Sequence, residues 1–426
     1  EIELPFTEDM TAVGAALARI ARARAGGHSE LGVLRRQIER EFNNLQAYDL
    51  GSGNDGLVGG GGESPERPID IATRAEAMLQ NYANQADHHT RRTFAGIGGL
   101  ISSMAGLPGR KSVLYASEGL TTRPGEQLYE ALVASSPDMA RQLGSAQFAS
   151  QRWDSTDVLQ DLARTASANR VVFYTLDAKG LDSGLAQADT LGLTIVGSQA
   201  DLSAHDAMIH LAAATGGDSV LNPASAGSLF DRMATDFSEY YSLGYVSPNE
   251  RDGEFHRLEV RLKDGKNARV RHNEGYRAST VKQEMLDRTV SALVLDAADN
   301  PLDVRVELGE AQPESKDRYV LPVLVKVPIA KLVLVPQQRE HKGKVTVYVA
   351  VRDPDGRMSE PQSVEIPVDI PNESLLTAMS REVGYGMNLL VRSGEAKLAV
   401  GVRDEVGAVA STVNLNVSVG DKVASK

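Results

Sequence analysis

The sequence predicts an α/β domain with a doubly wound, mostly parallel sheet, followed by an all-β sandwich domain. Stretches 109–120 and 170–180 each run from basic residues through a continuous apolar segment into polar residues. This pattern is typical of a central parallel strand that is covered on both faces. Residues 157–169 between them have helical apolar spacing, which completes a strand–helix–strand unit. From 302 to 419, short β-rich runs alternate with turn clusters, and this spacing favours a sandwich.

Both predicted strands end in polar side chains. The first ends at Ser117 and Glu118, and the second ends at Asp177, with Lys179 just beyond it. Carboxyl ends of parallel strands share one edge, and ligands of open α/β sheets bind outside that edge. We therefore expect Ser117, Glu118, Asp177 and Lys179 to form a partner-binding rim.

Helices are expected on either side of these strands. Stretches 11–24, 30–48 and 69–106 place apolar residues at intervals of three and four, as amphipathic helices do. The glycine-rich stretch 51–64 predicts a flexible loop, because glycine permits many backbone states. It lacks the Lys-Ser or Lys-Thr ending of a phosphate-binding loop.

Two local expectations concern the end of the α/β domain and its only tryptophan. Residues 240–246 read as a strand, and the alternating stretches 256–262 and 268–272 predict an antiparallel hairpin. Trp153 is expected to hold a loop to the core rather than to anchor a partner. The expected division of the chain is an α/β domain over 1–279, a helical connector over 280–301 and a sandwich over 302–426.

Several separated motifs carry a family resemblance. The two strand segments, the Thr-Gly-Gly at 215–217 and the stretches 240–245 and 275–276 occur in one order. In this, the chain resembles the von Willebrand factor A-related domain of acidobacterial-type exported proteins. The resemblance implies a doubly wound domain that binds protein partners, often through a divalent cation in a metal-ion-dependent adhesion site. It also implies a secreted, periplasmic or cell-surface location.

The metal site is where this sequence departs from the family. The first metal motif, Asp-x-Ser-x-Ser, is absent, and residues 1–7 resemble the end of the third strand. The first strands are therefore expected to be missing from this sequence. Glu118 stands where the family has Asp, and its extra methylene shifts the charge in a site that requires strict geometry. No cofactor is expected; the alternative is a working Mg²⁺ or Ca²⁺ site that includes Ser117 and Glu118.

Composition narrows the partners. The net charge of −12 and the lack of basic runs mixed with aromatic residues argue against nucleic acid. The absence of cysteine excludes disulfides, iron–sulfur clusters and thiolate zinc sites. No apolar run is long enough to span a membrane. The expected partners are proteins, in a homo- or hetero-oligomer.

An enzyme is not expected. The sequence has no Gly-x-Ser-x-Gly, no His-Glu-x-x-His and no Lys-bearing phosphate loop. The alternative is a hydrolase with Ser117 as nucleophile, which would need one of the eight histidines, for example His205 or His210, within hydrogen-bond reach as a base. The favoured function is a non-catalytic binding, adhesion or assembly protein of the bacterial cell envelope, with a degenerate metal site.

Overall fold

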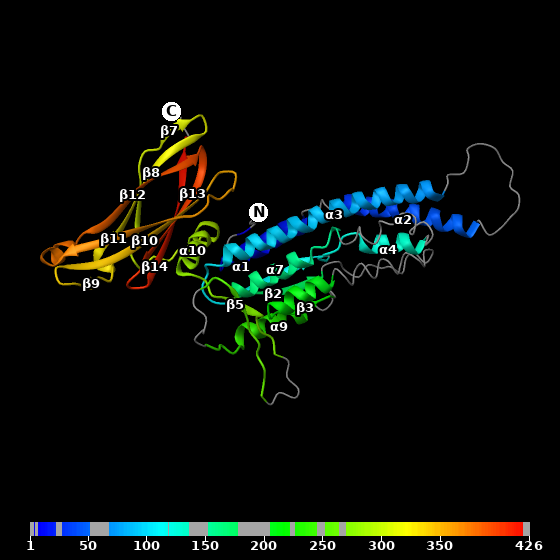
Figure 1. Cartoon of the computed structure of the whole chain (residues 1–426), viewed down its shortest axis with the longest axis horizontal. Coiled ribbons are helices and arrows are strands. Elements are labelled where there is room, and N and C mark those ends of the chain that lie inside the picture. Colours follow the sequence, from blue (N-terminus) through cyan, green and yellow to red (C-terminus); the bar gives the residue numbers. More distant parts are fainter. Residues whose placement is uncertain are drawn as a thin grey trace.

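The computed structural model describes residues 4, 7–22, 28–51, 68–117, 119–135, 152–177, 205–221, 226–244, 252–263 and 270–420. Long helices and a small parallel sheet make up the N-terminal part, and antiparallel strands make up the C-terminal part, with helix α10 between them (Figure 1). The coarse prediction of an α/β region followed by a β region is therefore confirmed.

The N-terminal helices are α1 (Met10–Arg22), α2 (His28–Gly51) and α3 (Pro68–Met104). Helices α2 and α3 lie side by side (Figure 1) and share an apolar core with α4 (Glu126–Ser135). Trp153 belongs to this core: its indole nitrogen donates to Asn84 Oδ1 at 3.0 Å, and its ring stacks on Tyr129. The expectation that Trp153 packs in the core is thus confirmed.

The parallel sheet consists of β1 (Lys111–Ser117), β2 (Val171–Asp177) and β3 (Ser219–Val220), in the order β1-β2-β3. The connection from β1 to β2 includes α4 and then α7 (Thr156–Ala168), which directly precedes β2, and the two strands pair in parallel. The predicted strand–helix–strand unit is therefore confirmed. Strand β2 is covered on both faces, by α3 and α7 on one side and by α9 (Ala226–Ser238) on the other.

The Thr-Gly-Gly motif at 215–217 fastens the helix that includes residues 205–214 to β2. The Phe173 amide donates to Thr215 Oγ1 at 2.9 Å, and the Thr215 hydroxyl donates back into its own helix, to Leu211 O. A Cβ on Gly217 would lie 1.9 Å from Phe173 O. Only glycine fits at this close approach between two backbones.

Two local predictions are wrong. Residues 240–244 form no strand, and 245–246 lie outside the described residues. The expected hairpin is replaced by β4 (Phe255–Arg257), which pairs with β5 (Gly275–Arg277). A Cβ on Gly275 would lie 2.3 Å from His256 O. The absence of a side chain at Gly275 thus permits a pairing that lies outside the alternating stretches.

Helix α10 (Val281–Leu295) joins the two regions and begins at the N-cap Thr280, whose hydroxyl accepts from the Gln283 amide at 3.1 Å. On one side, the Ser291 hydroxyl donates to Ser103 O near the end of α3 at 2.7 Å. On the other side, Asn414 Nδ2 donates to Ala292 O at 2.9 Å. The predicted helical connector is therefore packed against both regions.

The C-terminal part contains two antiparallel sheets that enclose one hydrophobic cluster. One sheet has the order β12-β8-β6, with β7 also paired to β8, and the other has the order β11-β10-β13-β14, with β9 paired to β10. The strands are β6 (Arg305–Leu308), β7 (Gln312–Ser315), β8 (Arg318–Pro328), β9 (Val335–Pro336), β10 (Glu340–Arg352), β11 (Gln362–Pro371), β12 (Glu382–Arg392), β13 (Gly394–Asp404) and β14 (Val409–Val419). Short helical turns occur at Ile329–Lys331, Asn372–Ser374 and Leu375–Ala378.

Candidate functional site

The carboxyl ends of β1 and β2 lie side by side. Ser117, the last residue of β1, is in register with Asp177, the last residue of β2. Two of the four predicted rim residues are therefore neighbours at one edge of the sheet. Glu118 and Lys179 lie outside the described residues, so their part in the rim stays a prediction.

A histidine that sequence reasoning did not assign to the rim binds Asp177. His205 is at the start of the described part of its helix, and its Nε2 lies 3.1 Å from Asp177 Oδ2. The Asp177 carboxyl is buried, and the His205 ring is mostly buried. A buried carboxylate needs such a partner, because burial without hydrogen bonds disfavours its charged form.

The Ser117 side chain forms hydrogen bonds within the loop that follows β1. Its hydroxyl donates to Gly119 O at 2.9 Å, and the Gly119 amide donates to Ser117 Oγ at 3.4 Å. Gly119 has a φ of 140°, a conformation that favours glycine. Earlier on the same strand, burial raises the pKa of the Tyr115 phenol, while a hydrogen bond with Ser117 acts in the opposite direction.

A second polar layer lies beneath this rim. The Thr175 hydroxyl is 2.8 Å from Ser219 Oγ and 3.2 Å from Met208 O. These contacts connect β2 with β3 and with the helix that contains His205. Thr175 is two residues before Asp177 and so faces the same side of the strand. A polar residue inside an otherwise apolar strand is the sequence signal that could have pointed to this layer.

The hydrolase geometry is not assembled among the described residues. Serine, histidine and aspartate side chains do occur at one rim, but the histidine contacts the aspartate and the serine contacts Gly119. His210 instead lines a separate hollow of about 410 Å³ with Arg164, Phe255 and Glu274. No hydrogen bond joins Ser117 to a histidine within the described ranges, whereas a base must reach the nucleophile's proton.

The described rim residues fit a divalent cation poorly. They supply one carboxylate, one oxygen of which faces the His205 ring, and one hydroxyl, which is bonded to its loop. Mg²⁺ requires near-octahedral oxygen coordination. Across the described parts of the chain, no group of three or more His, Asp or Glu side chains has a metal-binding arrangement.

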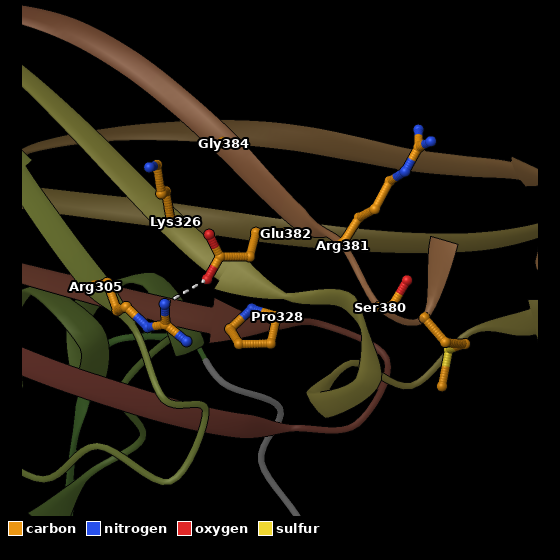
Figure 2. Close-up of a pocket in the computed structure, with 8 residues that line it drawn as sticks. Arg305, Lys326, Pro328, Ser380, Arg381, Glu382 and Gly384 are labelled. Carbon is orange, nitrogen blue, oxygen red and sulfur yellow. Dashed lines mark ion pairs between the residues drawn. The ribbon is translucent and has the colours of Figure 1, made fainter. Parts of the chain in front are cut away.

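A separate pocket of about 560 Å³ lies on the outer face of the β12-β8-β6 sheet. In Figure 2, the Glu382 carboxylate lies close to Arg305, while the Arg381 side chain extends away from both. Arg305 Nη1 is 3.3 Å from Glu382 Oε1, and Lys326 Nζ is 2.5 Å from Glu307 Oε1. Each of these two cations therefore has an acidic neighbour within the chain, whereas the third lining cation, Arg381, points away from Glu382.

No protein-family model and no curated protein matches the chain. A structural genomics target called SoR45 is similar at 13% identity, with 30% of this chain and 95% of that one covered and a TM-score of 0.21. An ApaA protein from Bordetella pertussis is similar at 12% identity, covering 28% and 94%, with a TM-score of 0.19. A β-glucuronidase from Bacteroides uniformis shares 11% identity over 27% of this chain and 13% of the enzyme, with a TM-score of 0.18. Similarities this low support no conclusion about function.

The helices also bear on membrane association. Of those in the described ranges, none combines the length and the apolar character that a bilayer span requires.

Proposed function

We propose that this chain is a non-catalytic protein-binding module of the von Willebrand A type, which acts in adhesion or assembly at the bacterial cell envelope. Its partner would contact the rim formed by Ser117, Glu118, Asp177 and Lys179. The second region would be a fibronectin- or immunoglobulin-like sandwich that holds the first region at a defined orientation through α10.

One observation carries this proposal: the parallel, in-register ends of β1 and β2, which bring Ser117 and Asp177 to one edge. In an open parallel sheet this edge is the usual place for a ligand. The Asp177–His205 pair supports recognition rather than chemistry, because among the described residues His205 bonds to Asp177 and Ser117 bonds to Gly119, and no hydrogen bond joins the serine to the histidine. A rim with fixed polar groups and adjoining loops suits a protein surface.

Site-directed cross-linking tests the rim. The chain has no cysteine, so a single Ser117→Cys variant can carry a photoreactive group at the rim alone. The matched control is Arg110→Cys, which precedes β1 at the opposite edge of the sheet. We expect one defined protein adduct from the native source with the Ser117 variant and none with the control. Equal adducts at both positions would contradict a rim-specific partner.

A cation titration tests the metal alternative. We expect calorimetry with Mg²⁺ or Ca²⁺ to show weak binding or none, because the Asp177 carboxylate faces His205 and Ser117 bonds to its loop. Asp177→Asn is the matched variant, since it keeps the shape and removes the charge. A micromolar dissociation constant that this variant abolishes would establish a working adhesion site instead.

A further inference from the structure

Strand β12 (Glu382–Arg392) is an unpaired edge. It pairs with β8 on one side, and no described strand pairs with its other side. An unpaired strand presents a row of free amide and carbonyl groups, and proteins normally protect such edges with proline, charge, short length or a covering segment. Strand β12 has eleven residues, no proline and charged residues only at its two ends.

The other edges of the two sheets are protected. Strand β11 contains Pro367 and Pro371 together with acidic residues. Strand β6 has only four residues. Strand β14 is bridged by Asp299, whose amide donates to Thr412 O at 3.1 Å and whose carbonyl accepts from the Thr412 amide. Strand β14 is as long as β12 and also lacks proline and charge. Strand β12 differs from it in that no backbone segment among the described residues bridges its free side.

Two prolines in β8 show which β12 groups are free. Pro322 lies opposite Asn388 and Pro328 lies opposite Glu382. Proline has no amide hydrogen, and Pro322 O accepts from the Gly309 amide at 2.8 Å, away from β12. Asn388 therefore lies at a non-hydrogen-bonded position of the ladder, and its own amide and carbonyl face the free edge. The backbone amide and carbonyl of every second residue from Glu382 to Arg392 point to the free edge in the same way.

The strand is complementary to itself in the antiparallel direction. Residues 382 and 392 each lie five positions from Met387, so a two-fold axis at Met387 would place Glu382 opposite Arg392 of a second copy at both ends of the pair. It would also place Gly384, which has no side chain, opposite Leu390, whose side chain is 51% exposed. Opposite-charge pairs are a favourable cross-strand combination, and glycine at 384 leaves room for the Leu390 side chain of the second copy.

Apolar surface lies next to the same edge. A groove of about 470 Å³ between the two sheets is lined by Val347, Val364, Tyr385, Met387 and Leu389, among others. The inward-facing residues of β12 from Val383 to Leu389 are only partly buried, whereas those of the neighbouring strand β8 are fully buried. A second copy would bring its own Tyr385, Met387 and Leu389 beside this groove.

We propose that two copies of this chain associate through antiparallel pairing of β12 with β12, so that the β12-β8-β6 sheet continues across a two-fold axis at Met387. Such an interface is isologous, with the same surface contributed by both copies. Both Glu382 and Arg392 already have partners within their own chain, Arg305 and Asp355. The pairs across the axis would extend these into charge networks at both ends of the interface.

Charge exchange tests the register. We expect the full chain to sediment as a dimer in ultracentrifugation, and Glu382→Arg or Arg392→Glu alone to weaken dimerisation roughly tenfold, since each places like charges opposite one another twice. The double variant should restore the dimer. Glu310→Arg makes the same charge change on an exposed residue between β6 and β7 and should have no effect. Circular dichroism of each variant should match that of the native chain, which checks that the variant is folded.

A disulfide tests the axis itself. At a non-hydrogen-bonded antiparallel pair the two Cα atoms are about 4.5 Å apart, within the disulfide range of about 4.4 to 6.8 Å. With no native cysteine, Met387→Cys should form a covalent dimer on mild oxidation. Val409→Cys, an exposed position on β14, should not. A monomer at all concentrations would overturn the proposal, as would a dimer that resists both charge variants and does not become covalent in the Met387→Cys variant.

Discussion

The two regions of the molecule cover the faces of their sheets in different ways. In the C-terminal part, each antiparallel sheet covers the inner face of the other, and one continuous cluster fills the space between them. In the N-terminal part, the parallel sheet is covered by helices, and the cover is uneven. Strand β2 is almost entirely buried, whereas Leu114 on β1 is 37% exposed. Parallel strands normally require cover on both faces, so β1 is the less protected part of this core.

The two regions also differ in how far each depends on single close contacts. The antiparallel core is a broad set of interchangeable apolar contacts, and such cores tolerate individual changes when volume is kept. In the parallel sheet the closest glycine approach is to backbone, between Gly217 and Phe173 O, whereas Gly401 and Gly407 in the antiparallel region approach side chains. Single substitutions should therefore change the stability of the two regions by different amounts.

The largest effect is expected for Gly217→Ala. The added Cβ would lie 1.9 Å from Phe173 O, so β2 and the helix beside it must separate, at a cost of about 4 kcal/mol or more. Hydrogen exchange should show loss of protection in residues 152–177 and 205–221, with protection retained in 302–420. Gly99→Ala in α3 is the control, because its Cβ would meet nothing within 4 Å, and it should stabilise by roughly 0.5 to 1 kcal/mol. Equal loss of protection in both regions would contradict the comparison.

A smaller effect, at the junction between the regions, is expected for Ser291→Ala. The buried Ser291 hydroxyl donates to Ser103 O at 2.7 Å and accepts from the Gly106 amide at 3.0 Å. Its removal leaves buried groups unpaired, at a cost of about 1 to 3 kcal/mol. When urea unfolding is followed by a separate probe in each region, the two unfolding midpoints should move apart. Ser238→Ala, an exposed residue with bonds only inside α9, should change the free energy of unfolding by less than about 0.5 kcal/mol.

Sequence reasoning succeeded where local pattern determines structure. The apolar runs and the intervening helical spacing predicted β1, α7 and β2, and parallel pairing then placed Ser117 beside Asp177. Sequence reasoning failed where contacts between residues far apart in the chain determine the structure. The β4–β5 pairing depends on a close approach at Gly275, and the Asp177–His205 contact joins residues 28 positions apart. Spacing along a chain carries no information about such contacts.

The same limit applies to edges. The sequence predicted the β-rich runs of the C-terminal part, but which strand lies at an edge depends on the order of strands in the sheet. The uncharged centre of β12 reads like that of any buried strand. The uncharged centre indicates an unprotected edge only once the structure shows that β12 is paired on one side.

The smallest effect is expected at the amino end of the same parallel sheet, from Lys111. Burial, assisted by repulsion from Arg170, lowers the pKa of the Lys111 ammonium from 10.5 to about 8. The folded state therefore binds the proton more weakly than the unfolded state, so the charged form destabilises the fold fully below pH 8, and this penalty disappears as the pH rises toward 10.5. Lys111→Met should raise the midpoint of thermal unfolding at neutral pH, and its advantage over the native chain should shrink as the pH rises through that window. The gain is modest because the side chain is only half-buried and solvent screens its charge.

The matched control for this pH dependence is Lys316→Met, which changes an exposed lysine in the turn between β7 and β8. Its side chain is exposed to water in the folded state. The effect of Lys316→Met on the unfolding midpoint should therefore stay constant across the same window. If both variants gave the same pH dependence, partial burial of Lys111 in the parallel sheet would not be the cause of the effect.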